Sequence, residues 1–163
     1  MLHRSKINKG KITLGVIMLL TLVFIFSHSL MPPEASQAES DTVGGVVSSI
    51  FSTDTAFGAF LQTNISNIAH FCEYGVLGAE ISLAILLWGK RKIQMSLFSP
   101  LLAVAIAFAD ETVQLFSGRT ASLQDMWIDV FGFCTVYVIV AIGFLTLRFF
   151  RKGRKKKSRS EQA

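Results

Sequence analysis

The stretch MWIDVFGFCTVYVIVAIGFLTLRFF, residues 126–150, decides the fold class of this chain. A helical membrane span needs about 20 predominantly apolar residues, and this run meets that length. Three comparable runs precede it, at about 12–30, 65–88 and 97–116. None of the four alternates apolar and polar residues at period two, which disfavours a transmembrane β-barrel. The sequence therefore predicts an all-α integral membrane protein, a bundle of four helices.

The composition of the 163 residues agrees with this fold class. Hydrophobic residues make up 51% of the chain and charged residues only 17%, against roughly 25% charged residues in soluble domains. Intrinsic disorder is excluded because it requires low hydrophobicity, and a soluble enzyme is disfavoured. A net charge of +5 would be typical of a nucleic-acid-binding protein, so the positions of the basic residues decide what the charge means.

Fifteen of the sixteen Lys and Arg residues lie before the first run, between the second and third runs, or at the end of the chain. Cytoplasmic loops carry the excess of basic residues, so both termini are predicted to be cytoplasmic, and the loops at 28–64 and 117–124 to face outward. Nucleic acid is then disfavoured as a partner, and the tail is expected to contact anionic inner-leaflet lipids. The predicted parts are a basic N-terminus (1–11), a transmembrane domain (12–147) and a basic tail (148–163).

The first run has a second interpretation. Basic residues precede an apolar stretch, and Ser36 and Ala38 place small residues as at a signal-peptide cleavage site. The apolar stretch is long for a signal peptide, however, and Pro32 and Pro33 follow it. We therefore favour an uncleaved first span, with a cleaved signal peptide as the alternative.

The first outer loop contains a helical pattern of its own. Val43, Val46, Val47, Ile50 and Phe51 recur at helical spacing. This pattern predicts an amphipathic helix on the outer membrane interface. A short helix packed on the bundle fits the same pattern, and both interpretations stay open.

Six acidic residues fall inside or at the ends of the predicted spans, where a charge costs about 2.5–3.5 kcal/mol on insertion scales. Such residues face the bundle interior or water and are functional candidates. The acidic residues near the predicted outer ends of runs two, three and four lie at a similar depth in the membrane. His70, Glu73 and Tyr74 share one helix face because their spacing is i, i+3 and i+4. We predict a polar pocket that opens outward between these three helices, formed by His70, Glu73, Tyr74, Asp110, Glu111, Gln114, Arg119, Asp125 and Asp129.

Small residues in the same runs bear on helix packing. Gly75 and Gly78 in the second run permit a neighbouring helix to approach closely. Gly132 in the fourth run continues the stripe of Asp125 and Asp129. Close helix contacts are therefore expected beside the polar residues.

Several candidate residues also have purely structural interpretations. Ser122 and Asp125 fit a capping box at the start of the fourth helix. Arg119 fits an ion pair with Asp110 or Asp125 that holds its loop, and His70 fits a hydrogen-bonded interfacial histidine. All the candidates are predicted to lie at a similar depth in the membrane, and this favours a functional site over the separate structural interpretations.

Two segments, residues 67–78 and 109–132, resemble the VanZ-like family. The first carries a His followed by a Tyr in one helix, here His70 and Tyr74. The second carries, in order, the acid-rich stretch and the helix start that mark the family. The resemblance covers about residues 12–147 and maps the family pattern onto His70, Tyr74, Glu111, Gln114, Arg119, Asp125, Asp129 and Gly132.

The resemblance implies a small multi-pass protein of the bacterial cytoplasmic membrane that acts in the cell envelope. The family's name-giving member is linked to resistance to the glycopeptide antibiotic teicoplanin, and the family carries no settled reaction.

Three functions stay open at this point. The first is an envelope protein that binds a lipid-linked wall component and reduces glycopeptide action by an undefined mechanism. The second is a membrane enzyme acting on a lipid phosphate, in which carboxylates and His70 hold a divalent cation such as Mg²⁺ or Mn²⁺ and Arg119 binds a phosphate. The third is a small transporter or proton relay. Catalytic residues, cofactor and ligand are unassigned, and a homo-oligomer is compatible with the sequence.

Overall fold

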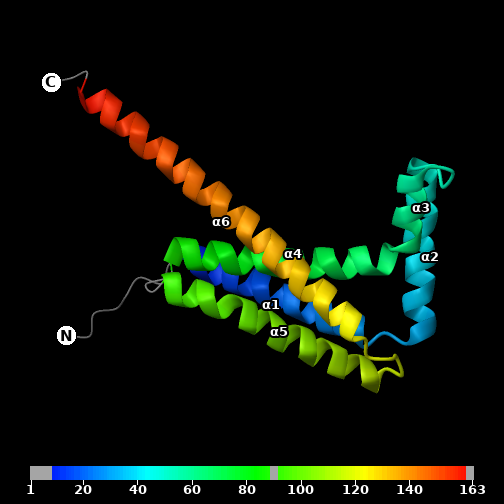
Figure 1. Cartoon of the computed structure of the whole chain (residues 1–163). Helices are drawn as coiled ribbons and strands as arrows, with labels where there is room; N and C mark the ends of the chain where they lie inside the picture. Colours follow the sequence, from blue (N-terminus) through cyan, green and yellow to red (C-terminus); the bar gives the residue numbers. More distant parts are fainter. Residues whose placement is uncertain (1–8, 89–91, 161–163) are drawn as a thin grey trace, which may run out of the picture.

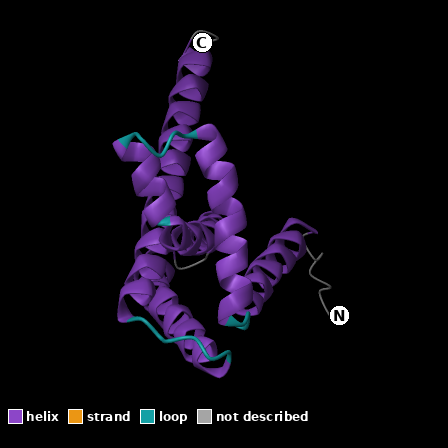
Figure 2. Ribbon diagram, turned by 90° about the vertical axis from the view of Figure 1, so that its right-hand side faces the viewer, coloured by secondary structure: helices purple, strands orange, loops and turns teal. Residues whose placement is uncertain are grey.

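The computed structural model describes residues 9–88 and 92–160, and its regular structure is helical throughout (Figures 1 and 2). This confirms the predicted all-α class. The helices are α1 (Lys9–Ser29), α2 (Pro33–Ile50), α3 (Ala56–Thr63), α4 (Ile65–Trp88), α5 (Lys92–Phe116) and α6 (Leu123–Ser160).

Four of these helices are long and apolar enough to cross a membrane: α1, α4, most of α5, and α6 as far as Arg151. They match the four predicted runs. Their large apolar side chains are widely exposed, as at Leu19, Phe108 and Ile139, which expose 60%, 66% and 62% of their surface. A chain with so much exposed apolar surface along its helices needs lipid around it.

Two of the helices are longer than the sequence runs. α5 begins at Lys92 and not near residue 97, and its first turns are tied to α6 because the Tyr137 hydroxyl donates to Ser96 Oγ at 2.7 Å. α6 begins at Leu123 and continues to Ser160, since the Lys and Arg of the tail are good helix formers. Of the predicted cytoplasmic segments, residues 1–8, 89–91 and 161–163 lie outside the described residues.

α1, α4 and α5 lie alongside one another, and α6 crosses them at an oblique angle (Figure 1). The start of α1 and the end of α6 lie toward the same end of the bundle (Figure 1), as an even number of spans requires. Which side of the membrane this end faces stays a prediction from the basic residues.

The segment between the first two spans, predicted to be an outer loop, forms two helices and not one. α2 begins at Pro33, a position that suits proline because its missing N–H has no partner in the first helical turn. α3 begins after Thr55, whose hydroxyl accepts the Gly58 N–H at 3.0 Å. The two helices pack together and lie across the far end of the bundle (Figures 1 and 2). Val46 and Ile50 on α2 are exposed, so an interfacial position stays consistent with the predicted amphipathic pattern.

α4 and α6 make the closest helix pair, and glycines permit it. A Cβ placed on Gly78 would meet the backbone of Phe133, and one on Gly132 would meet the backbone of Phe71. Backbone cannot move aside as a flexible side chain can. The contact between α4 and α6 therefore requires glycine at both positions, which confirms the close approach that the small residues predicted.

Candidate functional site: a buried polar cluster

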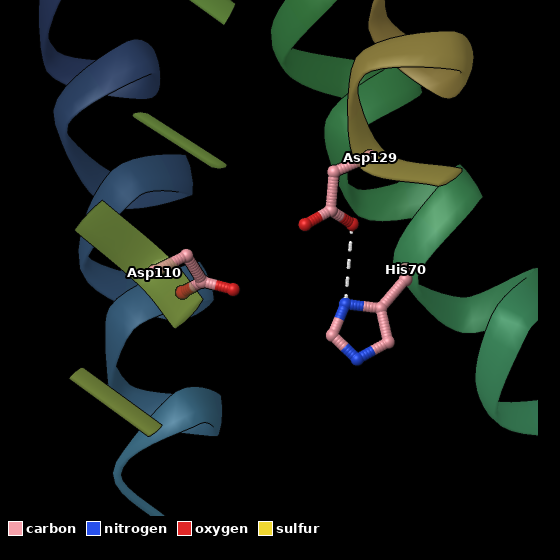
Figure 3. A group of neighbouring side chains, drawn as sticks. All are labelled: His70, Asp110 and Asp129. Carbon is pink, nitrogen blue, oxygen red and sulfur yellow. Dashed lines mark ion pairs between the residues drawn. The ribbon is translucent and has the colours of Figure 1, made fainter. Parts of the chain in front are cut away.

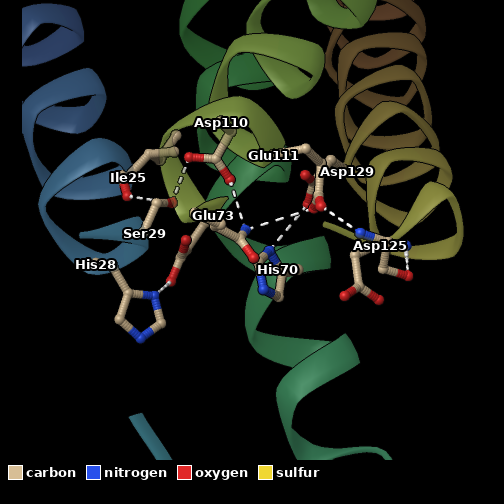
Figure 4. Close-up of polar contacts among 11 residues, drawn as sticks. Ile25, His28, Ser29, His70, Glu73, Asp110, Glu111, Asp125 and Asp129 are labelled. Atoms are coloured by element: carbon tan, nitrogen blue, oxygen red, sulfur yellow. Dashed lines mark hydrogen bonds and ion pairs between the residues drawn. The ribbon is translucent and has the colours of Figure 1, made fainter. Parts of the chain in front are cut away.

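Polar side chains from four helices meet at the end of the bundle where α1 and α5 finish and α4 and α6 begin (Figures 1 and 4). Six of the nine predicted pocket residues are buried, and four of these, Tyr74, Asp110, Gln114 and Asp129, are at most 1% exposed. We call the buried group the polar cluster; its members are Ser29, His70, Tyr74, Asp110, Glu111, Gln114 and Asp129.

His70 and Asp129 form the centre of the polar cluster. The His70 Nδ1 atom lies 3.2 Å from Asp129 Oδ1, so this pair links α4 to α6 (Figure 3). The two atoms form an ion pair without the alignment of a hydrogen bond. His70 is 4% exposed, so it is a residue of the bundle interior. Whether it lies at the depth of the membrane interface stays a prediction.

Asp110 faces this pair from α5 (Figure 3). One ligand atom each from His70, Asp110 and Asp129 lies within 4.8 Å of the other two. The sequence predicted that these residues share one level, and the structure brings them together from three helices.

Asp110 is held by two donors. The Ser29 hydroxyl at the end of α1 donates to one oxygen of Asp110, and the Gln114 amide donates to the other at 3.4 Å. Ser29 was not among the predicted pocket residues, because α1 was not among the helices assigned to the site. The available signal was its position among the polar residues that end the first apolar run.

Glu111 connects the polar cluster to the loop between α5 and α6. One of its oxygens accepts the backbone N–H of Ser122 at 2.6 Å, and the other accepts the Gln114 amide at 3.4 Å. The Ser122 hydroxyl accepts the Asp125 N–H at 3.3 Å. Only half of the predicted capping box is therefore formed within α6, and Glu111 from α5 occupies the place expected for the Asp125 carboxylate.

Glu73 turns away from the polar cluster toward His28 (Figure 4). His28 Nδ1 lies 3.0 Å from Glu73 Oε1, and its Nε2 lies 3.1 Å from Glu39 Oε2 on α2. A neutral imidazole carries only one N–H donor, so donating to both carboxylates at once requires the protonated ring. His28, which the sequence did not place at the site, thus links α1, α2 and α4 beside the polar cluster.

Arg119 and Asp125 lie at the edge of the group and are half-buried. Arg119 makes no ion pair with a carboxylate among the described residues, so the predicted pairing with Asp110 or Asp125 is wrong. Its backbone N–H donates to the Gln114 carbonyl at 3.2 Å, which fixes the loop on α5. One terminal nitrogen of the guanidinium is buried and has no hydrogen-bond partner within the described chain.

Two further polar atoms inside the cluster lack partners. The Tyr74 hydroxyl and the Oδ2 atom of Asp129 are buried without a hydrogen bond to any described residue. Both residues are 0% exposed. Buried polar groups in proteins nearly always have a partner, so these atoms call for an explanation.

An apolar groove of about 790 Å³ runs beside the polar cluster between α3, α4 and α6. Its walls include Phe71 and Ile128, the chain neighbours of His70 and Asp129. The residues of the polar cluster are themselves buried, and the outward-opening polar pocket stays a prediction.

Glu80 lies apart from the polar cluster, deeper along α4. The Thr21 hydroxyl of α1 donates to its Oε1 atom at 2.7 Å. Among the described residues no hydrogen bond or ion pair joins Glu80 to the cluster.

Comparison with known proteins gives one match. The sequence model of the family described as VanZ/LLP1 matches residues 14–152, most of the chain. No curated protein and no solved structure matches the chain.

Proposed function

Because this chain belongs to the VanZ/LLP1 family, we propose that it is a multi-pass protein of the bacterial cytoplasmic membrane that acts in the cell envelope. Its action would reduce the effect of teicoplanin-type glycopeptides or maintain the envelope. The observation that carries this proposal is the polar cluster, because buried ionisable residues within membrane helices are expensive and mark functional sites.

The proposed ligand is a phosphorylated lipid or a lipid-linked wall component in the outer leaflet. The Arg119 guanidinium, which has no ion pair among the described residues, is suited to a phosphate because Arg binds phosphate oxygens in a planar, bidentate way. The groove along α4 and α6 is suited to a hydrocarbon chain because its walls are apolar. A headgroup at the cluster and a chain in the groove would use neighbouring residues of the same two helices.

The test of this function is antibiotic susceptibility in the bacterium that carries the gene. A deletion strain is expected to be more susceptible to teicoplanin, and the wild-type gene to restore the original level. Asp110→Asn at wild-type abundance is expected not to restore it. Asp54→Asn, an exposed position in the turn between α2 and α3, is the matched control and should restore it fully. Unchanged susceptibility in the deletion strain would contradict the proposal.

A second candidate function is hydrolysis of a lipid phosphate or pyrophosphate. The observation that favours it is the set of His70, Asp110 and Asp129, whose ligand atoms lie close together. A divalent cation held there would stabilise the charge on a transferring phosphoryl group. Purified protein with Mn²⁺ is expected to release inorganic phosphate from a polyprenyl pyrophosphate, and Asp129→Asn to lose this activity. No release by the wild-type protein with Mn²⁺, Mg²⁺ or Zn²⁺ would rule out this candidate.

A further inference from the structure

The polar cluster contains more carboxyl groups than basic groups that could balance them. Asp110, Glu111 and Asp129 are all buried, and His70 is the one basic side chain that forms an ion pair with any of them among the described residues. Ser29, Gln114 and the Ser122 N–H supply hydrogen bonds but no charge. An uncompensated buried carboxylate is strongly unfavourable, so the cluster requires either another cation or bound protons.

The positions of three side chains favour a cation. Two donor atoms on one metal ion lie about 3.0–3.4 Å apart when each metal–ligand bond is about 2.1 Å. The 3.2 Å separation of His70 Nδ1 and Asp129 Oδ1 falls in that range. Asp110 completes a set of three within 4.8 Å and points at the other two across a narrow space (Figure 3).

The surroundings of these three residues resemble the outer shell of a metal site. Ligating carboxylates are usually oriented by hydrogen bonds from neighbouring groups, and Asp110 receives two, from Ser29 and Gln114. The unpartnered Oδ2 atom of Asp129 provides a further donor. Tyr74, whose buried hydroxyl also lacks a partner, lies within electrostatic reach of both Asp110 and Asp129.

From this arrangement we propose that His70, Asp110 and Asp129 bind one divalent metal ion. One imidazole and two carboxylates suit Mn²⁺ or Zn²⁺ better than they suit Mg²⁺, which is typically bound by oxygen ligands alone. Three protein ligands leave coordination positions for a ligand oxygen, as in catalytic metal sites. The ion would attract the phosphate of the ligand from within the cluster. The inference rests on the proposed function for the role of the site, but its test does not involve antibiotics or turnover.

The test is direct metal binding to the full-length protein in detergent after treatment with a chelator. Titration with Mn²⁺, followed by electron paramagnetic resonance, is expected to show one bound ion per chain, which Zn²⁺ displaces. His70→Ala, Asp110→Asn and Asp129→Asn are each expected to weaken binding more than about 100-fold, and Ser29→Ala, which removes only an orienting bond, about 10-fold. Glu80→Gln is the matched control: it changes a buried carboxyl of α4 outside the cluster and should bind as the wild type does.

Ser29→Ala keeps the test decisive if a ligand variant fails to fold, which circular dichroism will show. Absence of Mn²⁺ and Zn²⁺ binding by the wild-type protein would overturn the proposal and indicate that bound protons neutralise the cluster. Binding that survives all four cluster variants would also overturn it. Metal binding with no effect of deletion on susceptibility would leave the metal site standing and reject the proposed function instead.

Discussion

Glu111 on α5 accepts the backbone N–H of Ser122, the residue that caps α6, at 2.6 Å. One helix thereby completes the N-terminal cap of the next across a six-residue loop. The bond fixes where α6 begins, and with it the position of Asp129 two turns further on.

This bond predicts a specific loss of stability. Glu111→Ala leaves the Ser122 N–H unsatisfied, and we expect it to lower the free energy of unfolding by about 1.5–3 kcal/mol, the range for hydrogen bonds to charged groups. Asp125→Ala should change it by no more than about 0.5 kcal/mol, because its carboxylate does not close the cap. Denaturant titration of the purified protein in detergent measures both, and equal losses would show that α6 is capped from within.

The glycine contacts between α4 and α6 predict a position-dependent effect of an added methyl group. Gly132→Ala and Gly78→Ala should each destabilise the protein by about 1–3 kcal/mol, because the new Cβ meets backbone of the facing helix. Gly143→Ala, where nothing lies within 4 Å, should be neutral or stabilising by up to about 1 kcal/mol from helix propensity. Thermal unfolding compares the three variants, and a neutral Gly132→Ala would refute the close contact.

The His28 link predicts how α2 is held. Glu39→Ala removes the carboxylate that α2 contributes to the imidazole at 3.1 Å, so hydrogen exchange of the α2 amides should become faster while that of α4 is unchanged. Glu34→Ala, an exposed acid in the first turn of the same helix, is the control and should leave exchange as it is. Equal exchange in the two variants would mean that α2 is held by other contacts.

The predicted orientation can be tested with single cysteines in a chain whose Cys72 and Cys134 are replaced by alanine. Gly118→Cys in the loop after α5 should react with a membrane-impermeant maleimide on intact cells. Gly153→Cys in the basic tail should react only after lysis. Protection of position 118 in intact cells would place the polar cluster at the inner face and remove the support for an outer-leaflet ligand.

The sequence predicted the four spans and the shared level of the polar residues, because hydropathy and helical spacing are local properties. It did not predict which partner each side chain meets. The bond between Ser29 and Asp110 joins residues 81 positions apart, and its formation depends on how α1 is rotated about its axis. The same rotation brings His28 to Glu73 and so withdraws Glu73 from the cluster.

The prediction for Arg119 failed for a different reason. Charge alone suggested a pairing with Asp110 or Asp125, but Ser29 and Gln114 already bind Asp110. These bonds supply Asp110 with donors from α1 and α5, and the charges of the sequence alone did not reveal them.

The contribution of all four spans to the polar cluster has a consequence for biosynthesis. Ser29, His70 and Asp110 leave the ribosome before Asp129, which α6 brings last. Until α6 has entered the membrane, the imidazole of His70 has no carboxylate from that helix, and exposure of such groups to lipid is costly. The first three spans, α1, α4 and α5, are therefore expected to stay in a hydrated environment, at the insertion machinery or against a chaperone. Synthesis of the fourth span, α6, then allows the bundle to close.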